Sequence, residues 1–360
     1  RYDGMLIFVV LLLVAAGLVI LYSTSAYNGQ VKFHDPFHYL KKQGFATLLG
    51  LFGMALIARV DYHKWVPLAI PAYVTSIILS VAVIFFGDEY NGSKRWLSLG
   101  PISFQPSEFA KVAVIFFLAC LVSRNVQRMK RFRTMILMMI PVLPIVGLVG
   151  ASNLSTAIII LGIAVVLIFV ADPKYVRFIL MGSIGVGFMT VFLAMESYRL
   201  ERLAIWRHPE QYEKGYQTLQ GLYAIGSGGL FGRGLGNSVQ KLGFLPEAQN
   251  DMIFSIICEE LGLIGAGFII LLFLILIWRF FVISTKASDL LGALIAAGAM
   301  AHMMIQVILN IAVVTNSIPN TGITLPFISY GGTSVVFLLL EMGLVLSVSN
   351  YEGLRYGGSE

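Results

Sequence analysis

The sequence predicts an all-α polytopic membrane protein with ten transmembrane helices and one long extracytoplasmic loop. Hydrophobic residues make up 58% of the 360 positions and charged residues only 12%, about half the charged fraction of a typical soluble domain. The apolar residues also fall in blocks long enough to cross a bilayer, which takes about 20 residues per helix. No polar stretch resembles a soluble domain, so residues 1–360 are predicted to form a single membrane domain.

The apolar blocks give the predicted spans in order. The fifth and sixth spans are expected to form a hairpin that turns at "SNLS", and the long loop, residues 196–251, follows the seventh span. The ten predicted ranges are 4–24, 43–58, 66–86, 106–122, 135–151, 156–171, 177–195, 252–278, 288–313 and 331–350.

Charge predicts the orientation. The basic residues of the short loops concentrate on the side that holds the N-terminus, including those of "RNVQRMKRFR". Because cytoplasmic loops carry the excess of Lys and Arg, both termini are expected in the cytoplasm and the long loop outside. The net charge of +6 therefore reflects topology and contact with membrane lipids, not binding of nucleic acid. The two cysteines lie in apolar blocks without metal-ligand spacing, which favours buried structural thiols.

The stretch "FLPEAQNDMIFSIICEELG", residues 244–262, gathers acids at the start of the eighth span. Asp251 has two readings: a helix N-cap, which Asp often provides, or a carboxylate kept ionised by the helix end, suited to act as a base. At about 100° per residue, Ser255, Cys258 and Gly262 share its helical face. Glu259 and Glu260 lie deeper, and ion pairs within the bundle explain them better than catalysis.

A second stretch, "NGSKRWLSLGPISFQPSEFAK", precedes and opens the fourth span. Pro106 and Glu108 fit the first turn of a helix, and Glu108 and Lys111, three residues apart, are expected to form an ion pair. The plain reading is a well-built helix start behind an amphipathic loop. The functional reading places Lys94, Arg95, Gln105 and Glu108 in the same outer layer as Asp251, with Lys94 and Arg95 facing phosphate.

Two further stretches are rich in glycine. In "IPNTGITLPFISYGGTS", residues 318–334, the irregular backbone suits a cavity wall, and N–H groups of Gly331 and Gly332 could bind an anion. An ordinary turn is an equal alternative. The run from Gly226 to Gly236 lacks the lysine and preceding strand of a phosphate loop. It is interpreted as the hinge of a functional lid, with a rigid cap as the alternative.

Together, three stretches resemble the SEDS family (shape, elongation, division and sporulation) over nearly the whole chain: "KRWLSLGPISFQPSEFAK", "GYQTLQGLYAIGSGGLFGRGLGNSVQKLGFLPEAQNDMIFSIICEELGLIG" and "PNTGITLPFISYGGTS". The run "GLGNSVQK" is more similar to the division and sporulation branch than to the elongation branch. The sequence departs from the family pattern at Asn153, where an acid is common, and at His208 in "WRHPE".

The resemblance implies a peptidoglycan glycosyltransferase that polymerises lipid II on the outer face of the bacterial cytoplasmic membrane. It implies undecaprenyl pyrophosphate as the leaving group and a class B penicillin-binding protein as partner. Asp251 is then the general base or its positioner, and a divalent cation, Mg²⁺ or Mn²⁺, is a candidate aid. A lipid II flippase and a scaffold for the transpeptidase remain the alternatives. The remaining expected substrate-binding residues are Lys94, Arg95, Gln105, Glu108, Lys111, Lys241, Glu247, Ser329, Gly331 and Gly332.

Overall fold

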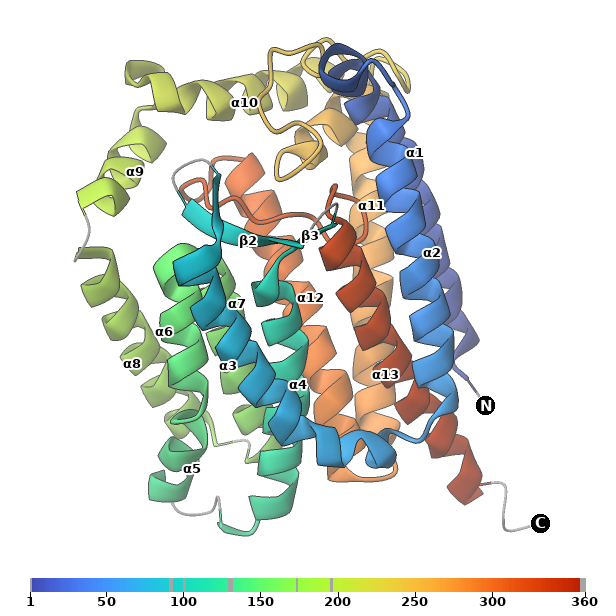
Figure 1. The fold of residues 1–360 in the computed structure, drawn as a ribbon, viewed down its shortest axis with the longest axis vertical. Helices are drawn as coiled ribbons and strands as arrows, with labels where there is room; N and C mark the ends of the chain where they lie inside the picture. Colours follow the sequence, from blue (N-terminus) through green and yellow to red (C-terminus); the bar gives the residue numbers. More distant parts are fainter. Residues whose placement is uncertain are drawn as a thin grey trace.

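The computed structural model describes residues 2–90, 93–99, 102–128, 132–172, 174–194 and 197–356. Its long helices stand side by side in a bundle (Figure 1). The N-terminal helix, α1 (Gly4–Phe33), and the C-terminal helix, α13 (Gly332–Tyr356), both have their terminal ends at the end of the bundle away from α9 and α10. Between them lie α2 (His38–Arg59), η1 (Tyr62–Leu68), α3 (Ala69–Phe86), α4 (Pro106–Asn125), α5 (Phe132–Met139), α6 (Val142–Ser152), α7 (Leu154–Ala171), α8 (Tyr175–Ala194), α11 (Ile253–Lys286) and α12 (Leu290–Val314).

These helices confirm a membrane-spanning helical fold. Among the described residues, seven helices are long and apolar enough to cross a membrane, or eight if α5 and α6, which meet at a bend of 41°, count as one span. The helices α2 and α8 fall on the two other predicted ranges and pack along α13 and α7. The count of ten spans stays a prediction.

Local sequence explains where helices begin. Pro106 occupies the first turn of α4 with Glu108 two residues later, as expected, because proline lacks the N–H that a helix start leaves unpaired. The hairpin at "SNLS" is also present: α6 ends at Ser152, and Asn153 caps α7 by accepting the Thr156 N–H at 3.3 Å.

The described residues between 88 and 104 depart from the all-α prediction. They form a three-stranded antiparallel sheet in the order β1 (Asp88–Tyr90), β2 (Ser93–Leu99) and β3 (Ile102–Phe104), above the ends of α3 and α4 (Figure 1). The strands pair Leu97 with Phe104 and Asp88 with Trp96. Two of the three strands have only three residues, too few for alternation to distinguish a strand from a loop.

The segment after α8, expected as a long loop, is partly helical. It contains α9 (Ser197–Arg207), η3 (Pro209–Gln211), η4 (Glu213–Gly215) and α10 (Tyr216–Gly228), and the chain from Gly229 to Met252 has no regular structure. In Figure 1, α9 and α10 arch over the end of the bundle that carries the sheet. Helix α10 packs along α11.

The glycine run docks on a break in α11. Gly262 interrupts that helix with φ +67° and ψ −169°, a conformation that glycine adopts without steric cost. Backbone hydrogen bonds join the glycine run to α11 on both sides of the break. This favours a rigid cap over a hinge for this part of the segment. The four bonds run from Arg233 N to Glu259 O and Gly234 N to Glu260 O, both 2.9 Å, and from Leu263 N to Gly229 O, 2.9 Å, and Ile264 N to Leu230 O, 3.2 Å.

Candidate active site

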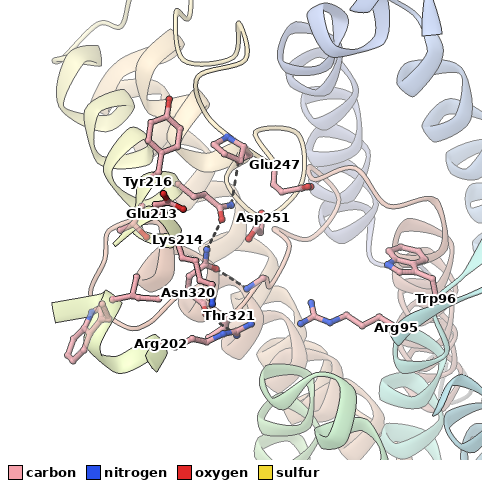
Figure 2. Close-up of a pocket in the computed structure, with 16 residues that line it drawn as sticks. Arg95, Trp96, Arg202, Glu213, Lys214, Tyr216, Glu247, Asp251, Asn320 and Thr321 are labelled. Carbon is pink, nitrogen blue, oxygen red and sulfur yellow. Dashed lines mark hydrogen bonds between the residues drawn. The ribbon is translucent and has the colours of Figure 1, made fainter. Parts of the chain in front are cut away.

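Two cavities meet at the end of the bundle that carries the sheet. The first, here the α4 cavity, has a volume of about 440 Å³ and lies between the sheet, α4 and the 318–334 segment. The second, the α9–α10 cavity, has about 470 Å³ and lies beneath α9 and α10 (Figure 2). Both are lined by Arg95, Trp96, Glu247, Asp251 and Gly322. Among the described residues, these five form the wall that the two cavities share, here called the shared wall.

Asp251 belongs to a turn that other segments hold in place. Helix α11 begins at Ile253 with Met252 as its N-cap, so of the two readings of Asp251 the N-cap is wrong. The Asp251 carbonyl instead accepts from Asn310 Nδ2 of α12 at 2.9 Å, and the same amide donates to Ile323 O at 2.7 Å. The carboxylate is thereby free of a capping role.

The Asp251 carboxyl is nearly buried, with 8% of its residue surface exposed. Burial and, next, the neighbouring Glu247 carboxylate together raise its pKa to about 7, while Arg95 acts in the opposite direction. The sequence-based expectation of a carboxylate kept firmly ionised by the helix end is therefore corrected. A carboxyl with a pKa near neutrality exchanges protons readily in both directions at physiological pH.

Arg95 approaches Asp251 across Gly322. A Cβ atom at Gly322 would lie 3.3 Å from Arg95 Nη1 and 4.0 Å from Asp251 Oδ2, and the backbone there has φ +69°. The Arg95 Nε donates to Ser152 O at 3.3 Å, which ties strand β2 to the end of α6. Figure 2 shows the Arg95 side chain pointing toward the Thr321 segment and Asp251. The absence of a side chain at Gly322 thus keeps cation and carboxyl close.

The predicted ion pair on α4 is confirmed. Lys111 Nζ lies 3.0 Å from Glu108 Oε1, and both side chains are almost fully buried while lining the α4 cavity. Two neutral groups complete the pair: Ser334 Oγ donates to Glu108 Oε2 at 2.9 Å, and Lys111 donates to Gln306 Oε1 at 2.9 Å. Charges buried at this depth need such partners.

Glu259 and Glu260 form ion pairs, as expected, but their partners lie in the 229–252 segment and not in the helices of the bundle. Lys241 Nζ, expected to bind substrate, instead donates to Glu260 Oε1 at 2.7 Å and to Ser23 Oγ at 3.1 Å. Glu259 accepts the Val239 N–H at 3.1 Å and lies 3.6 Å from Arg233. These carboxylates hold the 229–252 segment on α11, and Lys241 lines neither cavity.

The remaining predicted residues divide between the cavity and its supports. Gln105 and Gly331 line the α4 cavity, whereas Lys94, Ser329 and Gly332 line neither cavity. Ser329 Oγ donates to Asn250 O at 2.7 Å and accepts from Leu325 N at 2.8 Å, so it supports the Asp251 turn. The Gly331 N–H, expected to bind an anion, donates to Gln43 Oε1 at 3.1 Å.

Sequence reasoning missed most of the α9–α10 cavity. Arg202 donates to Asn320 O at 3.3 Å, and Asn320 Nδ2 donates to Gln217 Oε1 at 3.1 Å, which joins α9 and α10 to the 318–334 segment. A missed residue of the α4 cavity, Gln306, did carry a signal: His302, Gln306 and Asn310 recur every four residues within an apolar span. That spacing places polar groups on one helix face.

A cation site built from protein ligands alone is absent from the described ranges, which hold no group of three or more His, Cys, Asp or Glu residues with suitable geometry. Glu247 and Asp251 do offer two carboxylates in the shared wall. Magnesium commonly binds one or two carboxylates together with substrate phosphates, so this donor set fits a cation that arrives with a phosphorylated substrate.

Known proteins resemble this chain over its whole length. Stage V sporulation protein E of Bacillus subtilis is 40% identical, and a probable peptidoglycan glycosyltransferase FtsW of Geobacter sp. (strain M18) is 35% identical, with at least 96% of each chain covered. The Thermus thermophilus rod shape determining protein RodA superposes with a TM-score of 0.72 at 29% identity, covering 97% of both chains. A chain from a peptidoglycan synthase complex, in a structure concerned with the coordination of polymerization and crosslinking, superposes with a TM-score of 0.80 over 98% of both chains.

The family comparison agrees with these likenesses. The model of the FtsW, RodA and SpoVE family, described as cell cycle proteins, matches residues 3–353. The chain therefore belongs to the FtsW/RodA/SpoVE cell cycle protein family.

Proposed function

We propose that this protein is a peptidoglycan glycosyltransferase that polymerises lipid II into glycan strands. The observation that carries the proposal is the position of Asp251, a carboxyl with a pKa of about 7, in the wall shared by two cavities. A polymerase must bring two substrates to one point, and two cavities that meet at a titratable carboxyl provide that arrangement. Relatives named peptidoglycan glycosyltransferase support the reaction class.

The chemistry then follows from the shared wall. The 4-hydroxyl of the acceptor sugar attacks the anomeric carbon of the donor, and Asp251 takes the hydroxyl proton. The bond from that carbon to the diphosphate oxygen breaks, and its electron pair leaves with undecaprenyl diphosphate. Arg95 lies close to Asp251 and would stabilise the charge that develops on the diphosphate. A divalent cation held by Glu247 together with the substrate diphosphate would supply further neutralisation of that charge.

The proposal includes a location and a partner. Both termini lie in the cytoplasm, and α9, α10 and the sheet face the outside, in agreement with the excess of basic residues in the short loops at the terminal end. The partner is a class B penicillin-binding protein, which is supported by a structural neighbour that comes from a peptidoglycan synthase complex. Lipid II and membrane lipids are the small-molecule partners.

The α4 cavity separates this proposal from the flippase alternative. A flippase needs polar groups that line a path through the bundle. Here the deeper polar side chains, His302 and Glu341, pair with each other at 2.8 Å and line neither cavity. The polar cavity therefore ends at Lys111 and Gln306, which suits chemistry at one surface.

The test uses the purified protein, with its transpeptidase partner, in detergent with fluorescent lipid II. The proposal predicts a ladder of glycan that a muramidase digests. A separate vesicle assay follows the movement of labelled lipid II between leaflets. If lipid II moves between leaflets and no glycan forms, the protein is a flippase and not a polymerase. If neither activity is seen, the scaffold role is the remaining explanation.

A further inference from the structure

A buried chain of polar side chains lies directly behind the wall of the α4 cavity. It runs from Glu341 on α13 through His302 and Gln306 on α12 to Lys111 and Glu108 on α4. Glu341, His302, Gln306 and Lys111 are each only 1% exposed. Gln306, Lys111 and Glu108 line the cavity, whereas His302 and Glu341 do not. The cavity wall is thus connected to two ionisable groups that do not line the cavity.

The hydrogen bonds fix the orientation of Gln306. An ammonium group only donates, so the Gln306 atom 2.9 Å from Lys111 Nζ must be the amide oxygen, Oε1. The amide nitrogen accordingly donates to the Thr324 carbonyl at 3.1 Å. The reverse orientation would place an NH₂ group against an ammonium and a carbonyl against a carbonyl.

That orientation in turn fixes the proton on His302. Its Nε2 lies 2.9 Å from Gln306 Oε1, which only accepts, so Nε2 must carry a hydrogen. The other ring nitrogen, Nδ1, lies 2.8 Å from Glu341 Oε2. One proton lies between these two atoms, either on the carboxyl, with a neutral ring, or on the ring, with a carboxylate. Both arrangements leave the pair neutral and keep the Nε2 hydrogen.

We propose that His302 and Glu341 are positioning residues, a buried pair that shares one proton and holds the Gln306 oxygen toward Lys111 in the substrate cavity. The remaining oxygen of Glu341, Oε1, has no hydrogen-bond partner among the described residues. A buried polar atom without a partner is costly. The Glu341 carboxyl is therefore held in place through its bond to His302, at some cost in stability.

The inference rests on the proposed function in one respect: Lys111 and Glu108 must contact lipid II. The variant Glu341→Leu leaves Nδ1 of His302 without a partner and releases the ring and then the Gln306 amide. We expect the affinity for lipid II to fall about tenfold or more, since misplacement of a binding group by about 1 Å can cost up to about a hundredfold. Asp251 and Arg95 do not belong to this row of hydrogen-bonded side chains. The pH at which the profile of kcat/KM for polymerisation bends should therefore stay the same in Glu341→Leu.

Two variants serve as controls. Glu341→Gln keeps a donor for Nδ1 without an ionisable group, and should restore near-normal affinity. Ser347→Ala removes a buried hydrogen bond from the same helix, to Val60 O at 2.7 Å, at a site remote from the cavity. It should lower the thermal unfolding midpoint and leave the affinity unchanged.

The experiment measures the dissociation constant of fluorescent lipid II for each full-length variant in nanodiscs, beside its unfolding midpoint. His302→Phe gives a second route to the same loss if Glu341→Leu does not fold. If Glu341→Leu or His302→Phe binds lipid II as tightly as the wild type, the inference is overturned. It is also overturned if both of these variants fail to fold while Glu341→Gln folds normally. A wild type that binds lipid II but makes no glycan would contradict only the proposed function.

Discussion

At the residue scale, Asp251 owes its properties to its neighbours. Burial and the Glu247 carboxylate raise its pKa to about 7. Only the ionised form can accept a proton from the substrate hydroxyl. The fraction of ionised Asp251 grows as the pH rises through the pKa, so activity must grow with it.

We therefore expect kcat/KM for lipid II polymerisation to rise with pH, to bend near pH 7 and to be flat above it. Glu247→Gln removes a negative neighbour that raises the pKa of Asp251, so the bend should move to lower pH. The measurement is the pH dependence of kcat/KM in both proteins. A bend that stays in place or moves upward in Glu247→Gln would refute the coupling.

Gly322 provides a second test at this scale. A methyl group there would stand 3.3 Å from Arg95 Nη1 on a backbone with φ +69°, which costs an L-residue roughly 1–2 kcal/mol. We expect Gly322→Ala to reduce polymerisation by at least about tenfold, because it separates Arg95 from Asp251. Gly236→Ala is the matched control, since that glycine also has a positive φ, +88°, and a Cβ there meets nothing within 4 Å. Equal rates in the two variants would show that the spacing is unimportant.

At the element scale, α4, α12 and α13 are joined by buried charge at the cavity. Glu108 and Lys111 lie 3.0 Å apart, and removal of one partner leaves an uncompensated charge that costs about 3–5 kcal/mol.

Glu108→Gln and Lys111→Met should therefore each lower the unfolding midpoint in detergent more than the double substitution does. Thermal unfolding of the three variants beside the wild type is the measurement. A double variant as unstable as the worse single variant would mean that the two charges do not compensate each other.

The docking of the glycine run on α11 is the second contact between elements that can be tested. A Cβ at Gly232 would come 2.2 Å from Glu260 O, whereas one at Gly236 meets nothing within 4 Å, although both glycines have positive φ. Gly232→Ala should thus lower the unfolding midpoint clearly more than Gly236→Ala does. The comparison cancels the cost of the backbone conformation and isolates the clash, so equal midpoints would argue against the docked arrangement.

These elements also show how far sequence alone reaches. Apolar blocks located the helices, and i,i+3 spacing predicted the Glu108–Lys111 pair, because both depend on local periodicity. The sheet, the break at Gly262 and the pairing of Lys241 with Glu260 depend on contacts between distant segments, which no local pattern records. Lys241 was predicted to bind substrate because the sequence of a loop does not show whether its lysine is exposed to ligand or buried in an ion pair. His302 and Gln306 were detectable as a polar stripe in an apolar span.

At the scale of the whole molecule, the fold brings three distant segments to one point. The sheet contributes Arg95, the segment after α10 contributes Glu247 and Asp251, and the α12–α13 connection contributes Gly322. Asn310 and Ser329 hold the Asp251 turn from behind. In this assembly, the Asp251 carboxylate accepts the proton that polymerisation releases.

The direct measurement is glycan formation from lipid II by purified Asp251→Asn. The amide has nearly the same shape, and the Asp251 backbone carbonyl that Asn310 holds at 2.9 Å is unchanged, so the variant should fold and keep the wild-type unfolding midpoint. It cannot accept a proton at neutral pH, so we predict a loss of polymerisation of at least about a hundredfold, within the range for removal of a general base. Glycan at near wild-type rates from folded Asp251→Asn would contradict the claim.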